Sequence, residues 1–171
     1  MSLPVFETLS THHDRQGFDC GVEPLNDFLK RQARQNAERD VGVTHVVVPV
    51  TGDSKILAYY TLLTRDVASA VIPAKKLPRG AIGTVLLGRL AVDKTAQRQG
   101  LGKRCLLRAM EKVEIAAREI GIYALAVDAL DDAAREWYIG LNYGFQALGD
   151  DPNHLFLPVA TIRLLLVPQG D

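Results

Sequence analysis

Two glycines lie between an apolar segment and a long helical pattern, in the stretch QRQGLG at residues 97–102. A helix that begins at glycines leaves backbone N–H groups free, and the helix dipole adds positive potential at the same place. Gly100 and Gly102 would let the backbone approach a pyrophosphate closely, while Arg98 and Lys103 would supply mobile positive charge. The stretch therefore predicts a phosphate-binding turn.

The spacing of these residues separates the turn from two common nucleotide motifs. Gln97, Gly100 and Gly102 fit neither GxxxxGK[ST] of a Walker loop nor the GxGxxG fingerprint of dinucleotide-binding folds. ATP and NAD are poorly supported. A glycine turn without any ligand is the alternative, and it would be preferred for an isolated GxG.

The rest of the chain predicts short elements that have to position this turn. Amphipathic and β-branched patterns indicate strands and helices in alternation. We expect strands at 5–9, 43–50, 55–64, 84–93 and 123–130, helices at 25–40, 100–120 and 131–140, and further apolar segments at 142–148 and 154–166. Antiparallel strands early and strand-helix-strand units later predict an α+β fold, with a mixed, mostly antiparallel sheet flanked by helices.

Length and composition favour a single domain over residues 1–171, with 47% of the residues apolar. The N-terminal residues lack the pattern of a signal peptide, and no stretch reaches the ~20 apolar residues of a membrane span. We expect a cytoplasmic protein. Cys20 and Cys105 form no metal-binding spacing, so both are interpreted as reduced structural residues.

Charge is unevenly distributed although the formal net charge is zero. Residues 30–118 hold 17 Lys and Arg against 7 Asp and Glu, and the two ends together hold 3 against 13. A positive face for a phosphate-rich partner is one interpretation. Folding of the acidic ends over the basic middle is the other, and the sequence leaves both open.

The stretch GRLAVDKTAQRQGLGKRCLLRAM resembles the coenzyme A motif of the GNAT superfamily of N-acetyltransferases, in which a Q/R-x-x-G-x-G/A loop follows a bulged strand. The resemblance implies acetyl-CoA as co-substrate, without a metal. It also implies that the strand end binds the pantetheine arm and thioester. The expected coenzyme contacts are Leu90, Ala91, Val92, Gln97, Arg98, Gln99, Gly100, Leu101, Gly102, Lys103 and, from the next motif, Ala134.

A second segment, DDAAREWY at residues 131–138 with Gly144 and Phe145 beyond, is similar to the family pattern N-x-x-A-x-x-[FY]-Y. Asp131 stands where Asn is usual, which puts a coenzyme contact there in doubt. The gap from Tyr138 to Gly144 is also longer than in the common form. The resemblance implies that Tyr138 is the general acid toward the leaving thiolate.

Four further segments extend the resemblance to nearly the whole chain: FDCGVEPLNDFLKRQARQ, KILAYYTLL, LLGRLAVD and DDPNHLFLPVATI. Together they are similar to the acetyltransferase toxins encoded beside ribbon-helix-helix antitoxins. This resemblance implies acetylation of the α-amino group of aminoacyl-tRNA, a block of translation, an antitoxin partner and a homodimer. Basic segments at 30–39, 75–79 and 98–108 would then contact the tRNA backbone.

Acyl transfer to an amine needs a neutral nucleophile, a stabilised oxyanion and a proton for the thiolate. An α-amine with a pKa of about 7.7 to 8.0 is already substantially neutral, so we assign no base residue. Backbone N–H groups near Leu90 and Val92 are the candidates for polarising the thioester. Arg89 needs a partner within its apolar strand, either substrate phosphate or a loop.

The four histidines show no metal or triad spacing and are expected to be surface or loop residues: His12, His13, His45 and His154. Two alternative functions stay open. One keeps the enzyme and replaces the acceptor by a small amine, an antibiotic or a protein N-terminus. The other is a non-enzymatic module that binds coenzyme or antitoxin. The intact motif residues argue against the latter.

Overall fold

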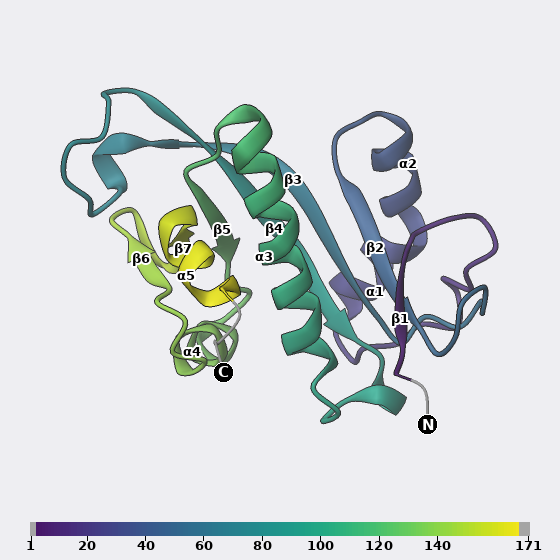
Figure 1. Ribbon diagram of the computed structural model, residues 1–171. Coiled ribbons are helices and arrows are strands. Elements are labelled where there is room, and N and C mark those ends of the chain that lie inside the picture. The colour runs from purple at the N-terminus through teal and green to yellow at the C-terminus, as the bar shows by residue number, and fades with distance from the viewer. Residues whose placement is uncertain (1–2, 168–171) are drawn as a thin grey trace. The chain divides into compact units, whose positions relative to one another are not determined.

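The computed structural model describes residues 3–167, whose strands form one mixed sheet of seven strands in the order β1-β2-β3-β4-β5-β7-β6 (Figure 1). The strands are β1 (Val5–Thr8), β2 (Val43–Val48), β3 (Ala58–Ala68), β4 (Ala81–Val92), β5 (Ala124–Asp128), β6 (Gln146–Leu148) and β7 (Asp151–Pro158). The α-helices are α1 (Glu23–Arg31), α2 (Ala33–Glu38), α3 (Leu101–Ile120), α4 (Asp132–Gly140) and α5 (Val159–Leu166). Short 3-10 turns lie at η1 (Ser69–Val71) and η2 (Lys94–Ala96).

Strand directions confirm the predicted α+β class. Strand β2 pairs antiparallel with both β1 and β3, and β7 pairs antiparallel with both β5 and β6. Strands β4 and β5 run parallel, because the long helix α3 lies between them in the chain and returns it to the same end of the sheet. No helix within the described residues is long and apolar enough to cross a membrane.

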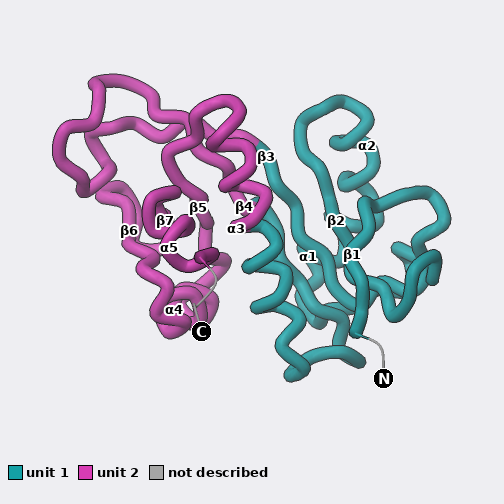
Figure 2. The backbone as a smooth tube through the Cα atoms, viewed as in Figure 1, with its two compact units in different colours: residues 1–63, 88–109 teal, residues 64–87, 110–171 magenta. Residues whose placement is uncertain are grey.

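The chain divides into two compact units, residues 1–63 with 88–109 and residues 64–87 with 110–171 (Figure 2). Strands β3 and β4 and helix α3 each contribute residues to both units. The glycine turn at 97–102 belongs to the first unit and Tyr138 to the second. That the whole chain acts as one domain stays a prediction.

The core of the first unit packs aromatic side chains from α1 and β3 together with the connection before α1. Phe18 contacts Tyr59 edge-on at 5.4 Å between ring centroids, and Phe28 stacks on Tyr59 at 6.3 Å. The Tyr59 hydroxyl donates to the Leu25 carbonyl at 2.6 Å, so the one polar atom of this buried ring has a partner. This cluster holds α1 and the connection that reaches the glycine turn.

The second unit has its own apolar cluster, which includes Val67, Ile72, Ala124, Leu148 and Phe156. These residues come from β3, β5, β6 and β7 and from the end of η1. Consecutive residues of β5 and β7 are buried, Ala124–Val127 and Leu155–Leu157, which explains the predicted apolar runs, since strands that are covered on both faces need few polar positions.

Two predicted elements differ from the structure. The helix expected at 25–40 breaks at Gln32, whose φ of −120° and ψ of −33° are not helical, and it restarts as α2. The apolar segment 154–166 divides at Pro158 into β7 and α5. Pro158 has an extended conformation and serves as the N-cap of α5, because proline has no N–H to give to a strand ladder.

Candidate functional site

The glycine turn, residues 97–102, bends twice through left-handed backbone before α3 begins at Leu101. Arg98 has φ of +64° and Gly100 has φ of +77°. Such conformations within a turn can direct backbone N–H groups into one concavity, which is an anion-binding arrangement. A Cβ built on Gly100 would meet nothing within 4 Å, so the space beside this backbone is open. Gly102 is the second residue of α3.

Gln97 bonds to the chain's own backbone. Its side-chain Nε2 donates to the Cys20 carbonyl at 3.2 Å and to the Val92 carbonyl at 3.0 Å. The side chain therefore ties the start of the turn both to the end of β4 and to the connection before α1. A predicted coenzyme contact at this residue would have to use its backbone.

Asp93 also ties the end of β4 to the connection before α1. The sequence did not predict this role. Its carboxylate accepts from the Thr95 N–H at 2.9 Å, from the Thr95 hydroxyl at 2.7 Å and from the Asp19 N–H at 3.0 Å. The Lys94 N–H in turn donates to the Asp19 carbonyl at 2.8 Å. The Asp-x-Thr pattern at residues 93–95 is a capping signal that could have identified this residue.

Hydrogen bonds keep Asp93 ionised despite its position. The residue is only 5% exposed. Burial alone would raise the pKa of the Asp93 carboxyl, but the bonds from Asp19 and Thr95 outweigh it and hold the pKa below its ordinary value. A charged, fully bonded carboxylate thus fixes the residues that lead into the glycine turn.

The end of β4 that precedes the turn extends beyond the ladder that β4 forms with β5. Among the described residues, the ladder between β4 and β5 ends at Leu87 and Val127, so Gly88–Val92 continue without a β5 partner. Leu90 and Val92 are half-buried and Ala91 is buried. β5 itself ends at Asp128, one residue beyond the last pair, so these positions of β4 extend past that strand.

Arg89 has a partner within the chain. Its guanidinium lies 4.7 Å from the centroid of the Phe28 ring, and Nη1 donates to the Gly88 carbonyl at 2.7 Å. The side chain is exposed. Because the guanidinium is stacked on Phe28 and reaches solvent, its charge is not buried. Phe28 and the Gly88 carbonyl are therefore the partners that Arg89 needs within its apolar strand.

The basic residues of the turn and of α3 divide into two groups. Arg98 and Lys103 are exposed, as is the neutral Gln99 between them. Arg104 instead donates to the Pro4 carbonyl at 3.0 Å and lies 5.5 Å from the Phe6 ring centroid. The mobile charge near the turn therefore comes from the first group.

Tyr138 is buried in the second unit, on α4. Its ring contacts Trp137 at 4.9 Å and Phe145 at 5.4 Å between centroids, both edge-on. Burial raises the pKa of the Tyr138 hydroxyl above its ordinary value. Within residues 3–167 this hydroxyl takes part in no hydrogen bond, so a structural partner does not account for it.

The unusually long segment after Tyr138 is accommodated by a turn. Asn142 and Gly144 have φ of +59° and +107°, and Phe145 returns to the tyrosine ring. Asp131 is the N-cap of α4, where its carboxylate accepts from the Ala134 N–H at 2.8 Å. The side chain that replaces the usual Asn is therefore used to begin the helix, and Ala134 is half-buried.

Two of the four histidines lie in strands and not in loops. His45 lies in β2, stacked on Tyr60, and His154 lies in β7 near Asp150. His12 and His13 lie in the connection between β1 and α1, as expected of loop residues, although His13 is buried. Their ring centroids are 4.0 Å apart with Glu7 beside both, a contact that spacing alone does not reveal.

Comparison with known proteins gives a consistent result. The model of the acetyltransferase (GNAT) family matches residues 9–145. The tRNA-acetylating toxin of Mycobacterium tuberculosis is 32% identical over 161 residues, covering 92% of this chain and 93% of the toxin. A tyrosine-to-phenylalanine mutant of KacT superimposes with a TM-score of 0.89 at 32% identity, covering 96% of this chain and 100% of that one.

Structures of the related toxin AtaT include its ligands and its partner. AtaT complexed with acetyl-methionyl-tRNAfMet gives a TM-score of 0.88 at 34% identity, over 96% of this chain and 99% of that one. AtaTR bound with AcCoA gives 0.85 at 35% identity, over 96% and 98%. A mutant AtaT bound to the C-terminus of the antitoxin AtaR gives 0.83 at 33% identity, over 96% and 98%.

The family model and the related toxins match most of the chain, and the predicted resemblance is confirmed. The chain belongs to the acetyltransferase (GNAT) family.

Proposed function

We propose that this chain is a toxin that transfers an acetyl group from acetyl-CoA to the α-amino group of an aminoacyl-tRNA. The observation that carries the proposal is the likeness, over 96% of this chain, to AtaT in complex with acetyl-methionyl-tRNAfMet. The enzyme is an acetyl-CoA-dependent N-acetyltransferase, as its family indicates.

The glycine turn binds the pyrophosphate of acetyl-CoA. Open space beside Gly100 and the left-handed backbone at Arg98 support this assignment, because backbone N–H groups and a helix start then face the anion. Arg98 and Lys103 contribute exposed positive charge. The side chains of Gln97 and Asp93 form hydrogen bonds within the protein and so stabilise the conformation of the turn.

The free backbone at the end of β4 accepts the pantetheine arm and polarises the thioester. Leu90, Ala91 and Val92 lie beyond the last residue pair of the β4 and β5 ladder, so their N–H groups are candidates for stabilising the oxyanion. The attacking α-amine needs little assistance, because much of it is already neutral near pH 8.

Tyr138 protonates the departing thiolate as the general acid. A raised pKa keeps its hydroxyl protonated at neutral pH, so the proton is available when the carbon–sulfur bond breaks. The new amide forms as the amine attacks the thioester carbon, and the amine's proton passes to water, which a backbone carbonyl can position by accepting a hydrogen bond. Coenzyme A is released as the thiol.

The acceptor is bound through its phosphates by basic segments at 30–39, 75–79 and 98–108. Their charges are largely exposed, including Arg31, Arg39, Lys75, Lys76 and Arg79. Phosphate contacts release counterions, so the affinity for tRNA falls steeply as salt is added.

The decisive experiment incubates the purified protein with labelled acetyl-CoA and a charged total tRNA pool, and then identifies the acetylated aminoacyl species. Label on aminoacyl-tRNA supports the proposal and names the acceptor. Unlabelled tRNA, with acetyl-CoA still bound, refutes the tRNA acceptor and favours a small amine or a protein N-terminus. Deacylated tRNA serves as the matched control, because it offers the same phosphates without the α-amine.

An antitoxin partner follows from the same proposal. AtaT binds the C-terminus of AtaR, and an unrestrained enzyme of this activity would arrest its own cell. We expect the partner to be of the ribbon-helix-helix type, the enzyme to be a homodimer and the site of action to be the cytoplasm. Coexpression with the product of a neighbouring gene, followed by a growth assay, tests the first expectation, and sedimentation of the purified chain tests the second.

A further inference from the structure

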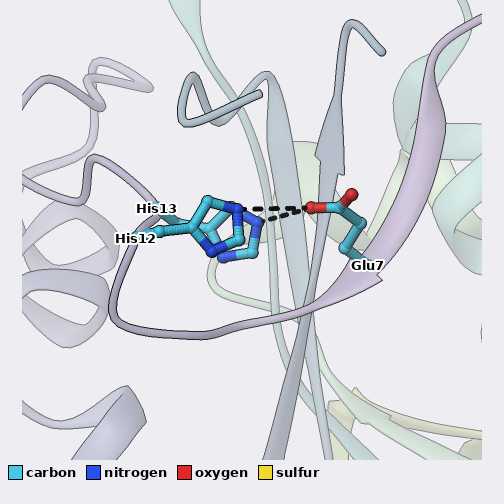
Figure 3. A group of neighbouring side chains, drawn as sticks. All are labelled: Glu7, His12 and His13. Atoms are coloured by element: carbon cyan, nitrogen blue, oxygen red, sulfur yellow. Dashed lines mark hydrogen bonds and ion pairs between the residues drawn. The ribbon is translucent and has the colours of Figure 1, made fainter. Parts of the chain in front are cut away.

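We infer that Glu7, His12 and His13 form a binding site for one Zn²⁺ ion. Glu7 lies in β1, and the two histidines lie in the connection between β1 and α1, where all three side chains converge (Figure 3). These residues belong to the first unit, and none of them has a role in the acetyl transfer described above.

The separations of the ligand atoms fit a tetrahedral ion. Zn–N bonds of ~2.0 to 2.1 Å and Zn–O bonds of ~2.0 to 2.2 Å place two tetrahedral ligand atoms about 3.4 Å apart. Glu7 Oε1 lies 2.8 Å from His13 Nε2 and 3.8 Å from His12 Nε2, on either side of this value. One ligand atom from each residue lies within 4.8 Å of the other two. Binding of an ion would therefore require the side chains to adjust, by about half an ångström in each of the two separations from Glu7 Oε1.

The atoms that would not contact the ion already have partners. The other Glu7 oxygen, Oε2, accepts from the Gly52 N–H at 2.8 Å. His12 Nδ1 lies 2.6 Å from the Ser10 hydroxyl, and His13 Nδ1 accepts from the Ser10 N–H at 3.0 Å. The bonds of Glu7 Oε2 and His12 Nδ1 are of the kind that orients metal ligands and raises affinity. They leave Oε1 and the two Nε2 atoms directed at one another.

Binding requires one proton to change position on His13. In the metal-free protein, Nδ1 of His13 accepts from Ser10, so Nε2 carries the proton and donates to Glu7. Coordination through Nε2 moves that proton to Nδ1, where the Ser10 hydroxyl, 3.4 Å away, is the acceptor. The ring stays neutral throughout, and the lost bond to the Ser10 N–H reduces the affinity below that of a preformed site.

Charge and exposure also suit a bound cation. A hydrogen bond from Gly52, followed by one from His13, holds the pKa of the Glu7 carboxyl below its ordinary value, so the ligand is anionic at neutral pH. The His13 side chain is fully buried, whereas 49% of the His12 side chain is exposed. The ion can therefore enter from the His12 side, and water can fill the fourth position.

The ligand set selects the metal class. Two imidazoles with one carboxylate suit Zn²⁺ and related transition metals, whereas Mg²⁺ and Ca²⁺ prefer sets composed of oxygen. A bound ion would fasten the connection that begins at Leu9 to β1. The far end of this connection carries Cys20, whose carbonyl accepts from Gln97. The ion would thus stabilise the support of the glycine turn.

The test titrates Zn²⁺ into the intact protein after removal of any histidine tag and dialysis against a chelator. We expect one ion per chain by competition with a chromophoric chelator, and a higher midpoint of thermal unfolding when Zn²⁺ is added. Binding of Co²⁺ should give the intense visible absorption of a tetrahedral site. The substitutions His12→Ala and Glu7→Gln should each weaken Zn²⁺ binding about tenfold or more.

Two control variants separate this site from other sources of binding. Thr11→Ala changes an exposed neighbour on the same connection, and His154→Ala removes the histidine beside Asp150 in the second unit. Both should bind Zn²⁺ like the parent protein. The inference is overturned if the parent binds less than one ion per chain, if folded His12→Ala and Glu7→Gln both keep its affinity, or if His154→Ala is the variant that loses binding.

Discussion

The Gln97 side chain donates a hydrogen bond to the carbonyl of Cys20, a residue 77 positions earlier in the sequence. The same Nε2 also donates to Val92, so one amide joins β4, the glycine turn and the connection before α1. The glutamine of the family motif therefore acts on the shape of the turn through the protein backbone.

Gln97→Met tests this supporting role, because methionine has a similar length and no donor. Loss of two hydrogen bonds should lower the free energy of unfolding by about 1 to 2 kcal/mol. The KM for acetyl-CoA should rise several-fold while kcat changes little, since the reacting groups are untouched. Urea denaturation and steady-state kinetics measure both effects. Gln146→Met, at an exposed position of β6 outside the turn, is the matched control and should behave like the parent.

The left-handed conformation of Arg98 predicts that a glycine at this position raises the stability of the fold and lowers the affinity for acetyl-CoA. A residue with a Cβ lowers the stability of the fold by roughly 1 kcal/mol or more when its φ is +64°. Arg98→Gly should remove this strain and raise the free energy of unfolding by a similar amount. Acetyl-CoA should bind more weakly, because the mobile charge beside the pyrophosphate is lost. Calorimetry of folding and of binding gives the two quantities.

Asp40→Gly provides the control for this prediction. Asp40 also has a left-handed conformation, with φ of +56°, and it lies in the turn between α2 and β2. The substitution should stabilise the protein similarly without changing acetyl-CoA affinity. An unchanged affinity in Arg98→Gly would remove Arg98 from the coenzyme site.

Local patterns were sufficient to predict most of the fold. Gly100, Gly102 and the apolar strand before them identified the turn, because glycine conformation and periodicity act over a few residues. Contacts across long separations were not accessible in the same way. The Gln97 and Cys20 bond, the cluster of Glu7 with His13, and the ring contact of Tyr138 with Phe145 all depend on how the chain returns to itself.

Asp93 predicts a specific dependence of stability on pH. A carboxyl whose pKa is lowered on folding stabilises the protein above its ordinary pKa of about 3.9 and loses this contribution as the pH falls through the folded value. Asp93→Asn should therefore be less stable than the parent at pH 7 by about 1 to 3 kcal/mol, because charged hydrogen bonds are lost. The difference should shrink below pH ~4. Unfolding by urea at several pH values measures it, and a constant difference would contradict the assignment. Asp53→Asn, at a half-buried turn residue whose carboxylate accepts from the Lys55 N–H at 2.9 Å, is the comparison.

Tyr138→Phe tests the assignment of the general acid. Removing the hydroxyl should slow the chemical step on the order of 100-fold, since general acid catalysis commonly contributes that much, while the Kd for acetyl-CoA stays close to that of the parent. Single-turnover measurement with labelled acetyl-CoA separates the two. Tyr143→Phe, five residues later and half-buried, controls for loss of a nearby hydroxyl. Because burial raises the pKa of Tyr138, the parent's kcat should show no decline from its ionisation up to about pH 10. A parent-like single-turnover rate in Tyr138→Phe would mean that the thiolate takes its proton from another group, and the retained ring contact with Phe145 would then be the residue's main contribution.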